Sequence, residues 1–351
     1  MTTTTVGAAI ERSRKMTASI EQEPGQHRML TGDRPTGDLH IGHYLSSLRS
    51  RVALQERGVD SFVLIADYQV ITDRDSVGQI KNHTLSLLTD YLAAGLDPER
   101  STIFAHSAVP QLNQLLLPFL SLVTQAELQR NPTVKDELAA SHRPLSGLLL
   151  TYPVHQAADI LFCKADVVPV GKDQLPHVEQ TRVVARRFNI RYAAGSEVFP
   201  EPTALINDQQ LILGVDGRKM SKSRGNVIRL AATEDETAAL IRKARTDSER
   251  TITYEPERRP EVANLLTIAS GFTGRAPESL VEDLGGGGSG VLKHLVIEAV
   301  NEGLRAHRER RTQLAEDRSY LIQILRAGNA KAEVVADKTL AEVRQAMSMD
   351  Y

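Results

Sequence analysis

Two short segments of the chain combine residue types that suit the chemistry of a bound triphosphate. Segment 40–43 reads His-Ile-Gly-His, and segment 219–223 reads Lys-Met-Ser-Lys-Ser. Histidines three residues apart can point from the first turn of a helix towards one ligand, and the free N–H groups of that turn favour an anion. The lysines are cations that can stabilise negative charge as it moves along a phosphate chain. We therefore predict that His40, His43, Lys219 and Lys222 are catalytic residues.

Each of the two segments also has a simpler interpretation. The histidines could merely cap and pack a turn, and the lysine segment could be a solvated basic loop, as most runs of charge are. The glycines at 32, 37 and 42 argue against a merely packed turn, because glycine lets the backbone approach a nucleotide closely. The specific order of residues 219–223 argues against a merely basic surface loop.

These segments need an α/β framework to position them. Short apolar runs alternate with amphipathic stretches in the first half of the chain, which is typical of a parallel sheet covered by helices. We expect strands at 29–31, 62–66, 102–105 and 167–170, and helices at 44–57, 77–94, 112–128 and 174–188. From about residue 231 the pattern is helical, with long runs at 290–307 and 308–326. The fold class is therefore α/β, followed by an all-α domain.

Composition is that of an ordinary globular protein with 351 residues, 41% hydrophobic and 25% charged. Cys163 is the only cysteine, which excludes an intramolecular disulfide and fits a reducing cytoplasm. Residues 1–26 lack the apolar core of a signal peptide and are expected to be a disordered extension. The glycine run 285–290 is interpreted as a natural turn, because helical patterning flanks it on both sides.

In this order, the two segments resemble the paired signatures of class I aminoacyl-tRNA synthetases, which bind ATP between them. Further segments are similar to tryptophanyl-tRNA synthetases, namely 149–153, 157–161, 168–174, 246–249, 252–254 and 264–266. The last three lie far along the chain from any ATP motif, so nucleotide binding alone cannot account for them. The resemblance runs from about Met29 to the C-terminus. It implies a Rossmann-like catalytic domain at 27–230, which includes the lysine loop, and a helical tRNA-binding domain at 231–351.

The segment 152–159 is a plausible site for an indole ring. If it is helical, Tyr152, Gln156 and Asp159 lie on one face. An indole has a single polar group, its N–H donor, and Asp159 could supply the acceptor. The alternative is that Asp159 is a solvated helix acid, the commoner fate of an aspartate.

The resemblance implies activation of tryptophan by ATP and transfer of the amino acid to tRNA, with Mg²⁺ carried on ATP and no metal site in the protein. Asp173 would meet the ribose, Leu211 and Ile212 the adenine, and Asp67 or Gln174 the substrate ammonium group. The ATP-binding residues it implies are Arg34, Pro35, Thr36, Gly42, His43, Gly171, Lys172, Asp173, Leu211, Ile212, Lys219, Met220, Ser221, Lys222 and Ser223. The substrate-binding residues it implies are Asp67, Tyr68, Tyr152, Gln156, Asp159 and Gln174.

The resemblance also implies a cytoplasmic homodimer. Two basic clusters in the helical part are candidates for tRNA contact, with a solvated helix face as the alternative for both. They consist of Arg242, Lys243 and Arg245, and of Arg305, Arg308, Arg310 and Arg311. A protein partner bound through the N-terminal extension also stays open.

The chain departs from the common bacterial pattern in the proposed site. His43 stands where Asn is frequent, Arg34 where Gln is usual, and His155-Gln156 where Leu-Met is usual; Tyr68-Gln69 replaces Gln-His. These changes suggest a divergent, second-type form. Two alternatives remain, a tyrosyl-tRNA synthetase and a non-catalytic paralogue that binds an amino acid or a protein partner.

Overall fold

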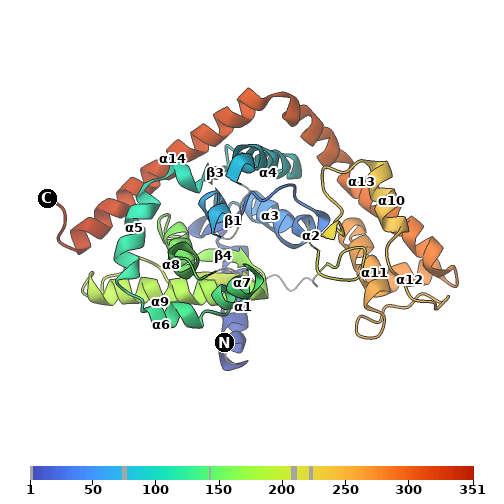
Figure 1. Cartoon of the computed structure of the whole chain (residues 1–351), viewed down its shortest axis with the longest axis horizontal. Helices are drawn as coiled ribbons and strands as arrows, with labels where there is room; N and C mark the ends of the chain where they lie inside the picture. Colours follow the sequence, from blue (N-terminus) through green and yellow to red (C-terminus); the bar gives the residue numbers. More distant parts are fainter. Residues whose placement is uncertain (1–2, 73–76, 142–143, 207–211, 221–223) are drawn as a thin grey trace.

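A parallel sheet forms the centre of the protein (Figure 1). The computed structural model describes residues 3–72, 77–141, 144–206, 212–220 and 224–351. In that part of the chain the sheet has five strands in the order β3-β2-β1-β4-β5, all paired in parallel. The strands are β1 (Arg28–Asp33), β2 (Asp60–Ile65), β3 (Ser101–Ala105), β4 (Val167–Val170) and β5 (Thr203–Ile206). The expected α/β class is confirmed, and β5 is a strand that the sequence analysis missed.

Alternate residues of the strands belong to different cores, because successive side chains point to opposite faces of a sheet. Val63 and Ile65 of β2 pack in the core that contains Tyr91 of α4 (Ile80–Ala94). Phe62 and Leu64 pack in the other core, with α5 (Gln111–Leu120), α8 (Gly147–Leu161) and α9 (Leu175–Arg191). Burial on both faces explains why β2 reads as a continuous apolar run.

The expected helices are present with shifted boundaries. The expected helix 44–57 begins as a π-helical segment, Tyr44–Leu48, and continues as α3 (Arg49–Arg57). The expected helix 112–128 is wrong, because the chain breaks after α5 and restarts as α6 (Gln125–Arg130). Thr124 and Glu127 form a capping box that starts α6. A further helix, α7 (Pro132–Ser141), precedes α8.

The C-terminal part is helical, as expected. Its helices are α10 (Glu234–Arg242), α11 (Pro260–Thr273), α12 (Pro277–Leu284), α13 (Gly288–Glu316) and α14 (Arg318–Ala346). The glycine run lies at the turn between α12 and α13. The two long helices separate at Asp317, whose side chain accepts from the Tyr320 N–H and so caps α14. The expected break between 307 and 308 is therefore wrong.

Helix α14 packs against the α/β part of the chain, across the boundary expected near residue 231. In Figure 1 it runs back across the molecule from the end of α13. Gly328 lies so close to β3 that a Cβ there would be 1.8 Å from the carbonyl oxygen of Ile103. Asn329 accepts from the N–H of Ala105 at 2.9 Å, and Thr339 donates to the carbonyl of Phe162 at 2.6 Å. The last helix is therefore held against the α/β part of the chain.

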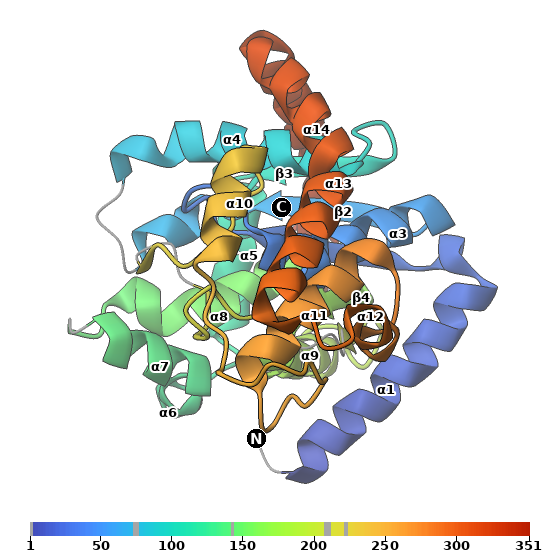
Figure 2. The same cartoon turned by 90° about the vertical axis from the view of Figure 1, so that its right-hand side faces the viewer.

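The expected disorder of residues 1–26 is corrected by helix α1 (Thr3–Gln22), which packs on β5 along the edge of the sheet (Figure 2). Ala9, Ser13 and Ile20 are buried at helical spacing. Ser13 accepts from the N–H of Ile206 at 2.9 Å, and Arg12 forms an ion pair with Glu179. The apolar positions, though few, recur every three or four residues, so the helix covers an edge strand that would otherwise be open.

None of the described helices combines the length and the apolar character that crossing a membrane requires.

Candidate active site

The candidate residues converge where the strands end. Arg34 follows β1, Asp67 follows β2, His106 follows β3 and Gly171 follows β4. The carboxyl ends of parallel strands lie at one edge of a sheet, and ligands bind where the strand order reverses. Here β1 and β4 are neighbours at that reversal. The sequence-predicted residues after β1, β2 and β4 therefore share one edge.

The first signature is a compact turn. His40 stands before the helical turn Ile41–His43, and its backbone N–H donates to Nδ1 of His43 at 3.3 Å. The two imidazole rings are 3.8 Å apart between centroids. The N–H of Ile41 donates to the carbonyl of Ile228 at 3.0 Å, so it is not free for a phosphate as the sequence analysis assumed.

The two signatures meet at Gly42. A Cβ at this position would lie 3.0 Å from the His40 ring and 3.2 Å from the sulfur of Met220, so a larger residue would displace one of them. Residues just after the lysine loop pair with the first signature as well. His40 and Arg229 form an isolated antiparallel bridge, and the N–H of Leu230 donates to the carbonyl of Leu39 at 2.9 Å. The structure thus brings together segments far apart in sequence.

The lysine loop has a defined base. Asn226 donates to Asp216 at 2.7 Å and to the carbonyl of Lys219 at 3.2 Å. This bond from Asn226 lowers the pKa of the Asp216 carboxyl below its usual value. Lys219 and Met220 are the last described residues of this segment, and Ser221, Lys222 and Ser223, together with Leu211, lie outside the described residues.

The segment around Ile212 is clamped by a helix of the C-terminal part. Ile212 is buried, and the next residue, Leu213, exchanges two hydrogen bonds with the Asn264 side chain, at 2.7 and 3.1 Å. Arg259 binds Asp247 through two nitrogens at 2.7 and 2.8 Å. Asn264 and Asp247 belong to the segments that resembled the family far from the ATP motifs, and these bonds are one physical reason for their presence.

A cavity of about 410 Å³ lies between the two signature regions. It is lined by Asp38, Gly225, Val227, Arg229 and Leu240. Pro35 is buried and Thr36 is half-buried in the turn that leads from Arg34 to Asp38.

The segment after β4 forms a short helical turn, Lys172–Gln174. Gly171, Lys172 and Asp173 are exposed, and Gln174 donates to Asp173 at 3.3 Å. These polar groups at the strand end can therefore reach a ligand above the sheet.

Tyr152 and Asp159 are buried side chains of α8, whereas Gln156 is half-buried. Asp159 is fully shielded from solvent, so the alternative of a solvated helix acid does not hold. One carboxylate oxygen lies 2.9 Å from Nδ1 of His106, and the other accepts from Gln69 at 3.5 Å. The sequence analysis did not include His106; its position directly after a strand was the available signal.

The surroundings of Asp159 shift two imidazoles in opposite directions. Burial alone would lower the pKa of His106, but the nearby Asp159 and Asp67 carboxylates raise it above its ordinary value. Burial lowers the pKa of His155, whose ring centroid is 4.0 Å from that of His106. Asp159 therefore faces an imidazole whose pKa is raised, and a second imidazole whose pKa is lowered lies next to the first.

The Asp67 carboxylate already accepts hydrogen bonds from neighbouring residues. It accepts from the N–H groups of Tyr68 and Ser107 at 3.0 and 2.9 Å, and the Ser107 hydroxyl binds its other oxygen. The Tyr68 ring meets His106 edge-on at 5.4 Å. Tyr68, and Asp67 beside it, therefore lie next to His106, the imidazole that faces Asp159.

Arg34 lies beside Tyr152. Its guanidinium is 5.8 Å from the centre of the Tyr152 ring and donates to Glu137 of α7 at 2.7 Å. The Tyr152 hydroxyl is 3.2 Å from Nε2 of His177. Burial, together with the nearby charge of Arg34, lowers the pKa of His177 to about 4. Glu137 and His177 were not foreseen, because the partners come from different helices.

Arg308, Arg310 and Arg311 of the second basic cluster donate to groups of the protein itself. Arg308 donates to Asn301 and Thr237, at 2.9 and 2.8 Å, and is half-buried. Arg310 donates to the carbonyl of Ala93 at 2.8 Å, and Arg311 donates to Asp90 at 2.7 Å. By contrast, Arg242, Lys243 and Arg245 are exposed.

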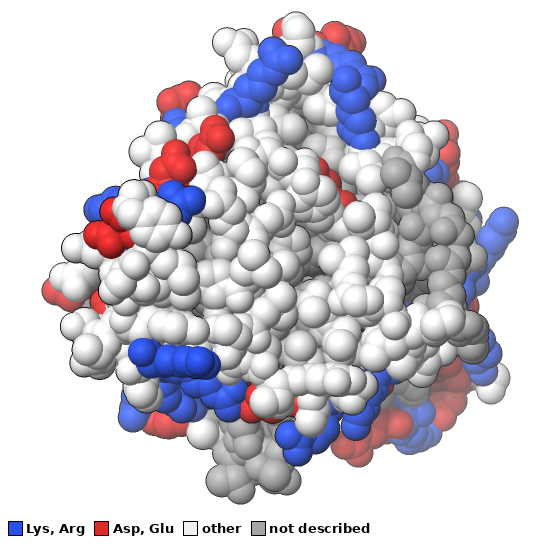
Figure 3. All heavy atoms as spheres, turned by 60° about the vertical axis from the view of Figure 1, so that its left-hand side comes forward, with Lys and Arg blue, Asp and Glu red and all other residues white. Residues whose placement is uncertain are grey.

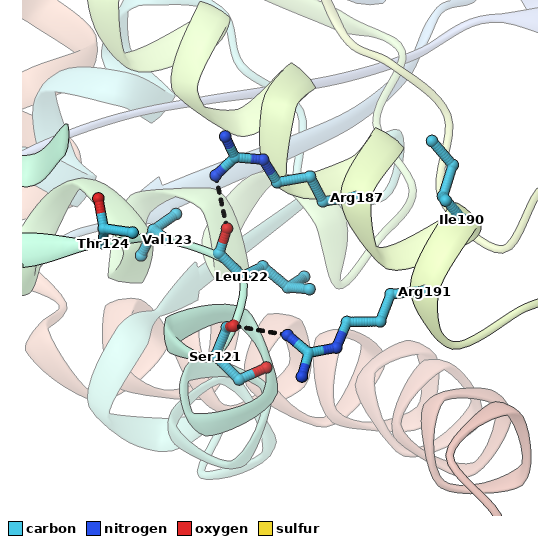
Figure 4. A pocket seen from close by; sticks show the side chains of 7 residues that line it. All are labelled: Ser121, Leu122, Val123, Thr124, Arg187, Ile190 and Arg191. Atoms are coloured by element: carbon cyan, nitrogen blue, oxygen red, sulfur yellow. Dashed lines mark hydrogen bonds between the residues drawn. The ribbon is translucent and has the colours of Figure 1, made fainter.

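A second cavity, of about 270 Å³, lies elsewhere on the surface (Figure 4). Arg187 and Arg191 of α9 donate there to the carbonyl groups of Leu122 and Ser121, at 2.6 and 3.1 Å. None of its lining residues belongs to the site described above.

Comparisons with known proteins agree with this geometry. A family model described as tRNA synthetases class I (W and Y) matches residues 22–305. The tryptophan–tRNA ligase of Clostridium longisporum is 41% identical over 335 residues, which cover 92% of this chain and 97% of that protein. That of Thermotoga maritima is 40% identical over 332 residues, covering 92% of this chain and 100% of that protein.

Solved structures show the same relationship. The tryptophanyl-tRNA synthetase of Campylobacter jejuni, complexed with ADP and tryptophan, has a TM-score of 0.79 and 32% identity, covering 92% of this chain and 99% of that one. The tyrosyl-tRNA synthetase of Archaeoglobus fulgidus shares the fold, with a TM-score of 0.65 and 24% identity, covering 81% and 90% of the two chains. The chain belongs to the class I tRNA synthetases, in the family of the tryptophan–tRNA ligases.

Proposed function

We propose that this protein activates tryptophan with ATP and transfers it to tRNA. The observation that carries the proposal is the fully buried Asp159 carboxylate, which can accept a hydrogen bond from a polar group on the substrate side chain. A buried acceptor suits the single N–H donor of an indole. A site built around such a bond rejects analogues that lack the donor by roughly 10⁴- to 10⁵-fold. The names of the relatives support the same substrate.

In the first step, the tryptophan carboxylate attacks the α-phosphate of ATP and pyrophosphate leaves. Catalysis needs positioning and charge stabilisation, without a covalent enzyme intermediate. His40, His43, Lys219 and Lys222 would act on the phosphates. Pyrophosphate leaves with negative charge, and the lysine side chains of segment 219–223 would stabilise that charge. In the second step, the terminal ribose hydroxyl of tRNA takes the acyl group and AMP leaves.

The other proposed contacts with the substrates are those that the resemblance to the family implies. Asp173 would hold the ribose, Leu211 and Ile212 the adenine, and Asp67 or Gln174 the ammonium group of tryptophan. The remaining proposed ATP contacts are Arg34, Pro35, Thr36, Gly42, Gly171, Lys172, Met220, Ser221 and Ser223, and the remaining amino-acid contacts are Tyr68, Tyr152 and Gln156.

Among the described residues, no group of three or more His, Cys, Asp or Glu side chains could hold a metal ion. We propose that Mg²⁺ comes with ATP and neutralises part of the phosphate charge.

The proposed second subunit would be another copy of this chain. Figure 3 shows a face with a broad centre that lacks charged side chains, on the side where α5, α9 and the end of α14 lie. Leu117 of α5 and Ile190 of α9 are 73% and 68% exposed. Exposed apolar surface of this kind favours association. Light scattering of the purified protein would measure the mass directly.

Exchange of labelled pyrophosphate into ATP tests the proposal. The protein should catalyse exchange with tryptophan far better than with tyrosine or without an amino acid. Preference for tyrosine would support the tyrosyl alternative. No exchange with any amino acid would support the non-catalytic paralogue, provided that the protein is folded.

A further inference from the structure

The backbone just before the first signature is bound to a buried carboxylate. The N–H of Leu39 donates to Oδ2 of Asp90 at 3.3 Å, and Asp90 is fully buried on α4. Its other oxygen accepts from Nε of Arg311, on α13, at 2.7 Å. Two hydrogen bonds therefore connect a helix of the C-terminal part to the residue next to His40.

The residue just after the first signature is also held by C-terminal helices. The ring of Tyr44, which follows His43, stacks on Phe272 of α11 with centroids 5.7 Å apart and planes 10° apart. It also meets the edge of His307, on α13, at 6.0 Å. His307 is buried, and its Nε2 lies 3.6 Å from Oδ1 of Asp90. The turn is thus linked to α13 at both ends, through Asp90 at Leu39 and through ring contact with His307 at Tyr44.

A further branch leads from Arg311 to the segment after the lysine loop. Its Nη2 donates to the Ser86 hydroxyl at 3.1 Å, and Ser86 donates to Asp38 at 2.9 Å. Asp38 lies 3.7 Å from Arg229, the bridge partner of His40. Arg311 is therefore linked to both signature regions.

We propose that Asp90 is a positioning residue for adenylate formation, which couples the place of the His40–His43 turn to the place of α13. A buried carboxylate is costly without its cationic partner, so the Asp90–Arg311 pair favours arrangements in which turn and helix keep their relative position. Small errors in the placement of reacting groups lower rates strongly. This inference rests on the proposed function, because it assumes that the turn acts on ATP.

The test uses the full-length protein and tryptophan-dependent pyrophosphate exchange, at a temperature below the Tm of every variant. Asp90→Asn keeps the shape of the side chain and removes its charge, and Arg311→Gln removes the partner. Each should lower kcat roughly 10- to 100-fold, as expected for a misplaced turn, with little change in the KM for tryptophan. The double variant should be no worse than the poorer single variant, because both remove one interaction.

Two further variants separate positioning from general stability. Arg311→Lys keeps the charge and should recover part of the kcat lost in Arg311→Gln. Arg310→Gln is the matched control, because Arg310 is the neighbouring residue of α13 and donates to the carbonyl of Ala93 instead of to Asp90. It should keep the kcat of the wild type.

The inference is overturned if Asp90→Asn and Arg311→Gln lower the Tm but leave kcat unchanged, or if Arg310→Gln loses as much kcat as they do. If Asp90→Asn does not fold, the comparison of Arg311→Gln with Arg311→Lys decides, because equal kcat in the two would contradict the proposal. Absence of exchange in the wild type would overturn the proposed function itself, and this inference with it.

Discussion

At the scale of single residues, the site contains carboxylates that are buried and paired with specific side chains. Asp33, at the end of β1, is an example outside the predicted set. Burial would raise its pKa, but the ion pair with Arg51 holds the pKa of Asp33 well below its usual value. Tyr91 donates to the same carboxylate at 2.7 Å. Such pairs anchor the ends of strands from which the candidate residues extend.

Asp159→Ala should weaken tryptophan binding while ATP binding is retained. The indole N–H would lose its acceptor, which costs roughly 1–3 kcal/mol. The chain contains no tryptophan, so the fluorescence of the bound substrate can be followed without a protein tryptophan background. Asp216→Ala is a suitable control, because that carboxylate lies at the base of the lysine loop. Unchanged tryptophan affinity in Asp159→Ala would place the indole elsewhere.

His177 should make the protein less stable in mild acid. Its pKa is about 4 in the folded state, against about 6.5 when unfolded, so the unfolded chain binds more protons between these values. Stability from neutral His177 is therefore present above pH 6.5 and is lost as the pH falls towards 4. The full loss is on the order of 3 kcal/mol.

The check is urea unfolding of wild type and His177→Gln at pH 7 and at pH 4.5. The difference in unfolding free energy between the two proteins should shift in favour of the variant at the lower pH. Other titrating groups are common to both proteins and cancel in this difference. An equal pH dependence in both would show that His177 is not held neutral.

At the scale of elements, the sequence predicts best where one pattern dominates. The apolar runs of β2 and β4 and the helical pattern after residue 231 were identified correctly. The break between α5 and α6 was missed because Thr124 and Glu127 form a local cap inside an otherwise apolar stretch. Helix α1 was missed because its buried stripe consists of few and partly polar residues, Ala9, Ser13 and Ile20 among them.

Ser13→Ala tests the role of α1. The N–H of Ile206 on β5 would lose its acceptor, which should lower stability by roughly 1–3 kcal/mol. Glu11→Ala, at an exposed position of the same helix, should have little effect. Thermal or urea unfolding of both variants gives the comparison. A Ser13→Ala variant as stable as Glu11→Ala would show that α1 contributes little to the sheet edge.

The candidate site was predictable to the extent that its residues follow strands or fill a short motif. Spacing and residue type predicted the turn with His40 and His43 and the helix face with Asp159, and the roles of these residues stay predictions. His106, Glu137 and Asn264 were not, because each acts through a partner that is remote in sequence and comes close only in the fold. The bond of Arg311 was not predictable for the same reason. Its charge suggested a contact with tRNA, whereas in the fold it donates to the buried Asp90.

At the scale of the whole molecule, the C-terminal helices pack against the α/β part of the chain. α13 contacts α4, and α14 packs along β3 and α5 (Figure 1), so the helical part is continuous with the core beside the two signatures. A tRNA surface must therefore be sought among side chains that remain exposed.

Charge reversal at Arg242 and Lys243 should weaken aminoacylation and reduce its salt dependence, while pyrophosphate exchange is spared. Cations that contact phosphates contribute in this way, because binding releases counterions. Arg275→Glu, on an exposed arginine paired with Asp283, serves as a comparison for a general change in charge. Equal loss of exchange and aminoacylation would show that these residues support the catalytic site instead.

The most direct test of the central claim is the identity of the amino acid attached to tRNA. The protein should be incubated with ATP, total tRNA and equal concentrations of tryptophan and tyrosine, and the amino acid released from the tRNA should be identified by mass spectrometry. We predict that tryptophan is attached and that tyrosine is not. Attachment of tyrosine, or tRNA that stays uncharged with active protein, would contradict the account.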